Sequence, residues 1–350
     1  MSTSSLRPIA AQTPLKHGRA ETPIAFIKAI CRAYTLRGMN YKRALEAAQI
    51  EPHLLKNANA RVTALQMEML SGIAMQALDD EALGWFDRRL PWGSYGMLVR
   101  ASLTAPTLGL ALKRWCRHHQ LLTDHIALQL TTHQGLATLQ LQEVRALGEF
   151  QEFCVVSTLR NALGVACWLT DSRIAIHATT LTFAAPAHAS SYPVLFEGAT
   201  QFNAEHNSLQ FDAGYLDLPV RRDEAALQRM LQRALVLTVK PYRRDRLLIE
   251  KVRQALSQHP EHCRNAADLA AWLHMSERTL HRQLKEEGAS LQALKDSVRR
   301  ELSMDLLLRT QKPIKQVAQD SGFLNEKSFI RAFKTWTELT PEAFRQSSGK

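Results

Sequence analysis

Cysteine is scarce in this 350-residue sequence, and its distribution excludes two kinds of structure. The five cysteines are Cys31, Cys116, Cys154, Cys167 and Cys263. Their number is odd and no two of them form a Cys-x-x-Cys pair, so the sequence supports neither a disulfide framework nor a zinc site. We expect no bound metal and no cofactor.

Long hydrophobic runs are also missing. No apolar run reaches the 18 or so residues that a membrane-spanning helix needs. The first residues, MSTSSLRPIAAQTPLKHGRAET, lack the apolar stretch of a signal peptide. We interpret residues 1–22 as a disordered leader, and we expect a cytoplasmic, nucleoid-associated protein without a membrane partner.

Basic residues exceed acidic ones, but only modestly. Lys and Arg number 44 against 33 Asp and Glu, which gives a formal net charge of +11 and a pI near 9.6. Residues 241–350 hold 20 of the basic and 14 of the acidic side chains, so positive charge is denser there than in residues 1–240. A phosphate-binding module needs such a density, although composition alone does not identify one.

The segment SERTLHRQLKEEG, residues 276–288, has the features of a short helix with two faces. Ser276 suits the N-cap and Gly288 the C-terminal end. Leu280 and Leu284 lie four residues apart and can both face a core. The other face is basic and consists of Arg278, His281, Arg282 and Lys285. A single face of this kind is usually solvated surface.

The same pattern returns about fifty residues later in NEKSFIRAFKTW, residues 325–336. Asn325 takes the place of the cap, and Phe329 and Phe333 take the places of the two leucines. The positions of the basic face are occupied by Lys327, Ile330, Arg331 and Lys334. Because a whole face is repeated, solvated surface becomes a poor explanation for it.

A short amphipathic segment precedes each basic helix, which predicts two helix-turn-helix units, at residues 266–287 and 313–336. The second turn is one residue longer than the first. Residues 290–310 lie between the units and predict a helix of about 20 residues, roughly 30 Å long. Such a helix could hold two recognition helices in successive major-groove segments, since one turn of B-DNA is about 34 Å. A plain helical bundle would explain its apolar stripe but not the repeated basic face.

The tail VRRELSMDLLLRTQKPIKQVAQDSGFLNEKSFIRAFKTWTELTPEAFR, residues 298–345, resembles the signature of the AraC/XylS family of bacterial transcription regulators. The resemblance covers roughly the last hundred residues. The sequence departs from the family pattern at four places. Leu324 stands where Ser or Thr is usual, and Ile330 where a small polar residue is common. Thr337 and Glu338 replace an aromatic–Gly pair, and His274 replaces a common Gly in the first turn.

The resemblance implies an all-α DNA-binding domain at residues 246–346 whose recognition helices contact double-stranded DNA. The residues in the matching positions are Ser276, Arg278, Thr279, His281, Arg282, Lys285, Glu326, Lys327, Ser328, Arg331 and Lys334. The family mostly activates transcription by binding beside RNA polymerase, so an activator that acts as a homodimer is expected. Two other classes compete with this interpretation, a DNA-repair enzyme with an appended AraC-like module and a non-specific nucleoid binder.

Residues 23–220 show a different pattern. Period-two alternation predicts strands in residues 124–130, 136–144, 172–183 and 200–211, and residues 147–170 predict a long buried helix between the strand pairs. Hairpins separated by helices indicate an α+β domain with an antiparallel sheet. Residues 221–245 then form a linker helix and hinge.

This first domain resembles the arabinose-binding-like regulatory domain of one AraC/XylS subgroup, typified by ornithine-utilisation regulators. The matching pieces are GSYGMLVRASLTAPTLGLAL and FNAEHNSLQFDAGYLDLPV. We expect it to bind a small-molecule effector, acidic or apolar rather than sugar-like. The candidate residues are Trp92, Tyr95, Arg100, Trp115, His118 and His119. The alternatives are that these aromatics form the core, that the basic residues form a solvated face, or that the domain only dimerises.

Overall fold

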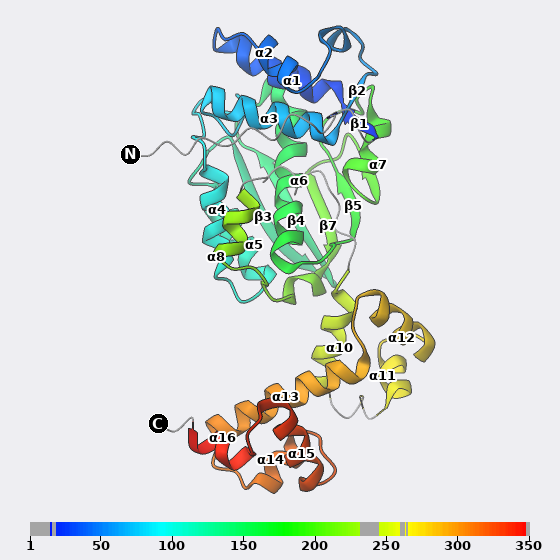
Figure 1. Cartoon of the computed structure of the whole chain (residues 1–350). Helices are drawn as coiled ribbons and strands as arrows, with labels where there is room; N and C mark the ends of the chain where they lie inside the picture. The colour runs from blue at the N-terminus through cyan, green and yellow to red at the C-terminus, as the bar shows by residue number, and fades with distance from the viewer. Residues whose placement is uncertain (1–14, 16–18, 232–244, 260–262, 264, 348–350) are drawn as a thin grey trace. The chain divides into compact units, whose positions relative to one another are not determined.

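The computed structural model describes residue 15 and residues 19–231, 245–259, 263 and 265–347. The chain divides into two compact units, residues 1–243 and 244–350, which are described separately below. The first unit mixes helices and strands and the second is all-α, as Figure 1 shows. The predicted fold class is therefore confirmed for both units.

The core of the first unit is a five-stranded sheet. Its strand order is β3-β4-β7-β5-β6, and all neighbours are antiparallel except β5 and β6. The strands are β3 (Ile126–His133), β4 (Leu136–Glu143), β5 (Ile176–Thr180), β6 (Ala199–Gln201) and β7 (Asn207–Asp212). The predicted antiparallel sheet is thus present. The strand predicted at residues 200–211 divides into β6 and β7, and the parallel pairing of β6 with β5 was not predicted.

Helix α6 (Gln151–Thr170) lies across one face of this sheet (Figure 1). The span Gly148–Thr170 is long and apolar enough to cross a membrane by length and composition. Glu152 and Arg160 interrupt the apolar residues of this span, so the sequence contains no continuous apolar run here. Most of the span is buried inside the unit, which is typical of the core helix of a globular domain.

Five further helices of the first unit matter for the site. α4 and α5 precede the sheet in the sequence, and α8 follows it. The bounds are α1 (Ile24–Leu36), α3 (Ala64–Leu78), α4 (Ser94–Leu103), α5 (Leu108–His119) and α8 (Glu224–Leu231); the shorter helices are α2 (Lys42–Ala47) and α7 (Tyr192–Leu195). Of the linker predicted at residues 221–245, the structure describes only residues 221–231 and residue 245, and α8 is the helix within this part.

A small second sheet corrects the expected leader. Residues 20–22 were assigned to the disordered leader, but they belong to β1 (Ala20–Pro23), which pairs with β2 (Arg61–Thr63). Leu15 is buried, and its carbonyl accepts a hydrogen bond of 2.6 Å from the Thr63 hydroxyl. Thr63 also caps α3 in a capping box with Gln66. This residue therefore connects Leu15, β2 and the start of α3. The remainder of residues 1–22 lies outside the described residues, apart from residue 19.

The second unit consists of helices around two small cores. The helices are α10 (Leu247–Gln258), α11 (Ala266–Trp272), α12 (Glu277–Glu286), α13 (Leu291–Arg309), α14 (Ile314–Asp320), α15 (Glu326–Thr337) and α16 (Pro341–Ser347). Leu291 and Leu294 of α13 belong to the first core, whereas Leu307 belongs to the second. The long helix α13 therefore takes part in both helix-turn-helix cores.

Candidate DNA interface and effector site

The first helix-turn-helix consists of α11 and α12. Ser276 caps α12, since its Oγ accepts a hydrogen bond of 3.1 Å from the Thr279 backbone N–H. Leu280 and Leu284 are fully buried against α10 and α11. The spacing of these two leucines fixes which side of α12 faces the core and leaves the basic side in solvent.

The exposed face of α12 carries the predicted basic residues. Arg282 forms an ion pair of 2.8 Å with Glu286, and His281 Nε2 lies 3.8 Å from Glu277 Oε1. Arg278 forms no ion pair with any other described residue. An exposed pair contributes less than about 1 kcal/mol, so DNA phosphate or a base can replace the carboxylate at low cost.

The second helix-turn-helix, α14 and α15, is built in the same way with an aromatic core. Asn325 caps α15 by accepting a hydrogen bond of 2.8 Å from the Ser328 N–H. Phe329 and Phe333 are fully buried, with ring centroids 5.6 Å apart. The exposed side chains of this helix include Lys327, Ser328, Arg331 and Lys334. None of its three cations forms an ion pair within the described part of the chain.

Three predicted positions differ from a simple exposed face. Thr279 and Glu326 are half-buried, and the Thr279 hydroxyl lies 2.8 Å from the capping Ser276 Oγ. Ile330, which occupies a basic-face position by sequence, packs against the second core. Its counterpart His281 is exposed, so the two faces are not equivalent at this position.

The turns of the two units follow one hydrogen-bonding pattern. The Met275 N–H donates to the Ala270 carbonyl at 2.9 Å, and the Phe323 N–H donates to the Ala318 carbonyl at 2.9 Å. Met275 is followed at once by the cap of α12, but Phe323 is followed by Leu324 and only then by the cap of α15. The extra residue of the second turn is therefore Leu324.

Glu287 and Arg253 join the first recognition helix and α13 to α10. The Glu287 carboxylate, at the end of α12, accepts a hydrogen bond of 3.0 Å from the Ile249 N–H. Burial raises the pKa of Glu287 to about 7. Arg253 of α10 binds both carboxylate oxygens of Glu301 on α13, at 2.6 and 2.8 Å. These contacts fix α10 against both helices.

Three of the six candidate effector residues come together in the first unit. The Tyr95 ring stacks on Trp115 with centroids 6.2 Å apart, and the Tyr95 hydroxyl lies 3.5 Å from His119 Nε2. Trp115 and His119 are both fully buried. Burial lowers the pKa of His119 to about 4, so this imidazole is neutral at pH 7.

Several buried polar atoms around these rings lack a partner. Trp115 Nε1 and His119 Nδ1 form no hydrogen bond with any other part of the chain that the structure describes. Burial raises the pKa of Tyr95 and of Cys154, and the neighbouring Thr158 hydroxyl opposes the shift in both. We refer to Tyr95, Trp115, His119 and Thr158 as the buried polar cluster. An unsatisfied buried polar group costs about 1–3 kcal/mol, so a bound molecule that supplied partners would be stabilised here.

The other three candidate residues are not part of this cluster. Trp92 is 47% exposed, and His118 is half-buried. Arg100 is exposed and binds Glu224 of α8 through two nitrogens, at 2.7 and 3.1 Å. Conversely, Thr158 belongs to the cluster but was not a predicted residue, because a hydroxyl within the apolar helix α6 resembles that of an ordinary core threonine.

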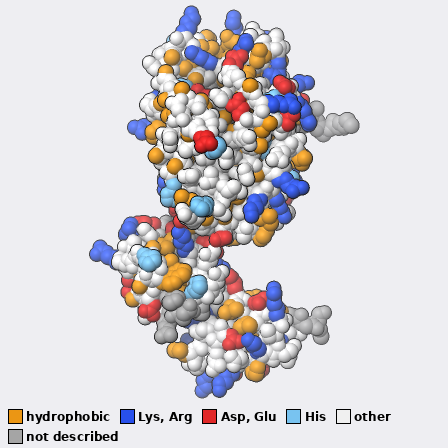
Figure 2. All heavy atoms as spheres, turned by 180° about the vertical axis from the view of Figure 1, so that it is seen from behind, with side chains coloured by type: hydrophobic (Ala, Val, Ile, Leu, Met, Phe, Trp, Pro, Cys, Tyr) orange, Lys and Arg blue, Asp and Glu red, His pale blue; other side chains and the backbone are white. Residues whose placement is uncertain are grey.

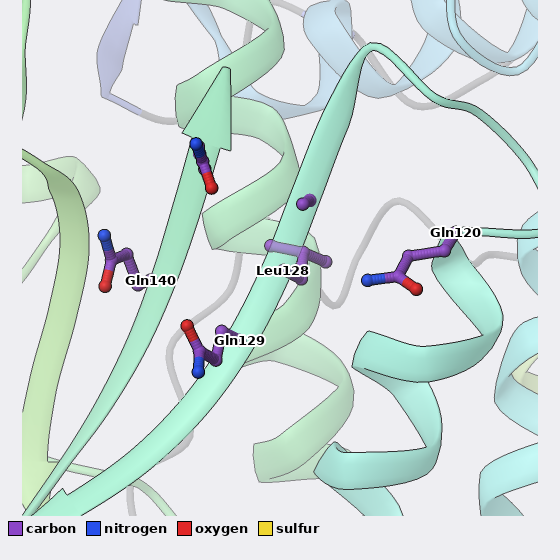
Figure 3. Close-up of a pocket in the computed structure, with 6 residues that line it drawn as sticks. Gln120, Leu128, Gln129 and Gln140 are labelled. Carbon is purple, nitrogen blue, oxygen red and sulfur yellow. The ribbon is translucent and has the colours of Figure 1, made fainter. Parts of the chain in front are cut away.

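A separate shallow hollow of about 350 Å³ lies beside the outer face of β3 and β4 (Figure 3). Gln129 and Gln140 face each other across the two strands. The lining residues are Gln120, Ala127, Leu128, Gln129, Gln140 and Gln142. Viewed from the side opposite to α6, the first unit has a broad area with few charged side chains (Figure 2). The hollow therefore offers amide groups and no charge.

Two protein-family models match the chain, one in each unit. The model "Arabinose-binding domain of AraC transcription regulator, N-term" matches residues 38–220, and a helix-turn-helix domain model matches residues 269–347. The first match alone spans more than half of the chain.

Curated relatives of the chain include two transcription regulators of one species. The chain is 26% identical over 335 residues to the ornithine utilization regulator of Pseudomonas aeruginosa, covering 95% of this chain and 99% of that one. It is 30% identical over 100 residues to the regulator VqsM of the same species, covering 29% of this chain and 31% of VqsM. The solved structure of the regulator CdpR from P. aeruginosa aligns over 92% of this chain and 98% of its own, with 17% identity and a TM-score of 0.34. The chain belongs to the AraC family of DNA-binding transcription regulators, in the group with an arabinose-binding-like N-terminal domain.

Proposed function

We propose that this regulator places both recognition helices on one operator. The observation that carries the proposal is the repeated exposed cationic face of α12 and α15, joined by the shared helix α13. Arg278, His281 and Arg282 would read one major-groove segment, and Lys327, Ser328 and Arg331 the next. With 19 residues, α13 is about 28 Å long, which is comparable to the ~34 Å of one DNA turn.

A footprint on a selected operator tests this arrangement. Full-length protein would select its site from random duplexes, and the protected stretch would then be mapped. Two helices in successive groove segments should protect about two helical turns, roughly 20 base pairs. Protection without a defined site would favour the non-specific nucleoid binder, and protection of about half that length would show that only one helix contacts DNA.

We further propose that the buried polar cluster is the effector site. Its one readily titratable member, His119, is neutral at pH 7 because its pKa is about 4, and Arg100 lies outside the cluster, paired with Glu224. The indole N–H of Trp115 can only donate, so the ligand must present an acceptor. This favours a small, largely apolar molecule with a carbonyl or hydroxyl group, and disfavours the acidic ligand that the arginines suggested.

Helix α4 contacts both the buried polar cluster and the linker helix α8, so it can connect the two. Tyr95 lies on α4 in the cluster, while the neighbouring Gly96 packs on Leu231 of α8 so closely that an added Cβ would come within 3.1 Å of it. Arg100, one turn later, is the residue bound to Glu224. A shift of α4 would therefore move α8, the helix that leads towards the DNA-binding unit.

A promoter reporter tests the effector site. The operator would drive the reporter in the native host under many nutrient conditions, so that an inducing condition is found first. Tyr95→Phe and Thr158→Val each remove one hydroxyl and should weaken induction, whereas Trp92→Ala, outside the cluster, should not. Normal induction in both cluster variants would remove the cluster from the effector site, while unchanged thermal unfolding of all three proteins would show that folding is preserved.

Activation beside RNA polymerase and homodimerisation are parts of the same proposal. The family of the chain supports both, together with a cytoplasmic location on the nucleoid. The proposed division is an effector and dimerisation domain at residues 23–220, a linker at 221–245 and a DNA-binding domain at 246–346. Mass measurement of the full chain, with and without operator, tests the dimer.

The alternative of a DNA-repair enzyme with an AraC-like module is poorly supported. Such chemistry needs a reactive, partly exposed thiolate. All five cysteines are buried, and burial raises the pKa of Cys31, Cys116 and Cys167 to about 12. Among the described residues, no three His, Cys, Asp or Glu side chains are grouped so that they could hold a metal ion.

A further inference from the structure

Leu324 is an inserted residue that has no counterpart in the first helix-turn-helix. Its two flanking residues have clear roles, since Phe323 packs on the second core and Asn325 caps α15. Leu324 itself is 100% exposed. A fully exposed leucine gains nothing from burial within the unit, so its side chain is not needed for folding.

Leu324 immediately precedes Asn325, the N-cap of α15, and so lies at the N-terminal end of this helix. The first turn of α15 contains the exposed Lys327 and Ser328, and Arg331 follows one turn later. In helix-turn-helix proteins, the N-terminal residues of the recognition helix contact base edges in the major groove. An apolar side chain immediately before that helix would therefore meet the bases rather than the phosphates.

Only one base presents an apolar group in the major groove, because the C5 methyl group belongs to thymine alone. We propose that Leu324 reads a thymine methyl group in the half-site of α15 and so determines part of the operator specificity. The inference rests on the proposed placement of α15 in the groove. The first helix-turn-helix lacks the insertion, and its Met275 packs against the first core, so no equivalent contact is expected in its half-site.

Uracil substitution tests the contact, since deoxyuridine differs from thymidine only by the missing methyl group. Each thymine of the selected operator would be replaced singly, and binding of the full-length protein measured. One or two replacements in the α15 half-site should weaken binding about 3- to 10-fold. Leu324→Ala should bind the thymine operator about 3- to 10-fold more weakly and show no further loss on those uracil duplexes.

A matched control is available in the same unit. Leu308 of α13 is also a largely exposed leucine, but it lies away from the recognition helix in sequence. Leu308→Ala should bind like the unchanged protein and keep its sensitivity to uracil. Neither substitution removes a buried side chain, so both variants should fold.

Two results would overturn the inference. Equal uracil sensitivity in the unchanged protein and in Leu324→Ala, or none in either, would show that Leu324 does not read a methyl group. Unchanged operator binding with lost promoter activity would instead assign Leu324 to a protein partner. Arg331→Ala separates this failure from that of the proposed function, because it should still weaken operator binding if α15 lies in the groove.

Discussion

The two helix-turn-helix units have the same backbone arrangement but differ in their buried core residues and in their exposed faces. Ser276 and Asn325 cap their recognition helices through the same side-chain to backbone hydrogen bond. The first unit has an aliphatic core, whereas the second is filled by Phe329 and Phe333. The first basic face is partly paired with carboxylates, and the second forms no ion pair within the described residues. Caps and buried positions therefore set the architecture, while the exposed positions are free to differ, as the proposed reading of two different half-sites would require.

The cores provide the largest test of this comparison. Phe333→Ala should destabilise the second unit by about 3–5 kcal/mol, since it removes a ring packed on Phe329 and Phe344. Leu284→Ala should destabilise the first helix-turn-helix by about 2–5 kcal/mol. Denaturant unfolding of the full chain measures both, with the exposed Leu308→Ala as control. If Phe333→Ala cost no more than the control, the aromatic core would not be what holds the second unit together.

The arginines provide the next test. A bidentate Arg–guanine contact is worth about 1–3 kcal/mol of discrimination, so Arg282→Ala and Arg331→Ala should each relax specificity in a different half of the operator. The loss should be larger for Arg331, because Arg282 gives up its pair with Glu286 in order to bind. Operator scanning with each variant checks this. A uniform loss on all sequences would show that both arginines contact phosphates instead.

Some of these features could be predicted from sequence and others could not. Helix caps, the leucine and phenylalanine spacing and the longer second turn depend on neighbours within a few residues, so the sequence reveals them. Burial depends on partners far along the chain. Trp115 and His119 are buried in the core by helix packing, whereas Arg100 is exposed and paired with Glu224, over one hundred residues later.

The β-structure shows the same limit. The long hairpin of β3 and β4 has clear period-two alternation and was predicted. β1 and β2 are short, and their pairing joins segments about forty residues apart. A four-residue strand that ends in Pro23 has no periodicity to detect, so the leader was drawn too long.

Glu287 makes the stability of the first helix-turn-helix depend on pH, by about 2 kcal/mol, and among the described residues the second helix-turn-helix has no matching group. Its pKa rises from 4.5 to about 7 on folding, so the folded state binds the proton more tightly. Stability should therefore fall as the pH rises from about 4.5 to 7, by on the order of 2 kcal/mol after allowance for partial exposure. Glu287→Gln keeps an oxygen for the Ile249 N–H and should remove this fall, while Glu286→Gln should not. Unfolding curves at pH 5 and pH 8 measure the difference; the same slope in both variants would assign it to other groups.

The smallest expected effect comes from substituting the turn residues of the two helix-turn-helix units. His274 has φ of 56° and its counterpart Gly322 has φ of 77°, so both lie in the left-handed region that favours glycine. A Cβ on Gly322 would find its nearest neighbour, Arg299 Nε, at an ordinary 3.7 Å, so the cost of Gly322→Ala is one of backbone conformation alone. Gly322→Ala should destabilise the second helix-turn-helix, and His274→Gly should stabilise the first helix-turn-helix, each by about 0.5–1 kcal/mol. Thermal unfolding of the two single variants and of the double variant measures this, and the double variant should lie close to the unchanged protein. Destabilisation by His274→Gly would mean that the imidazole, rather than the backbone, holds the first turn in place.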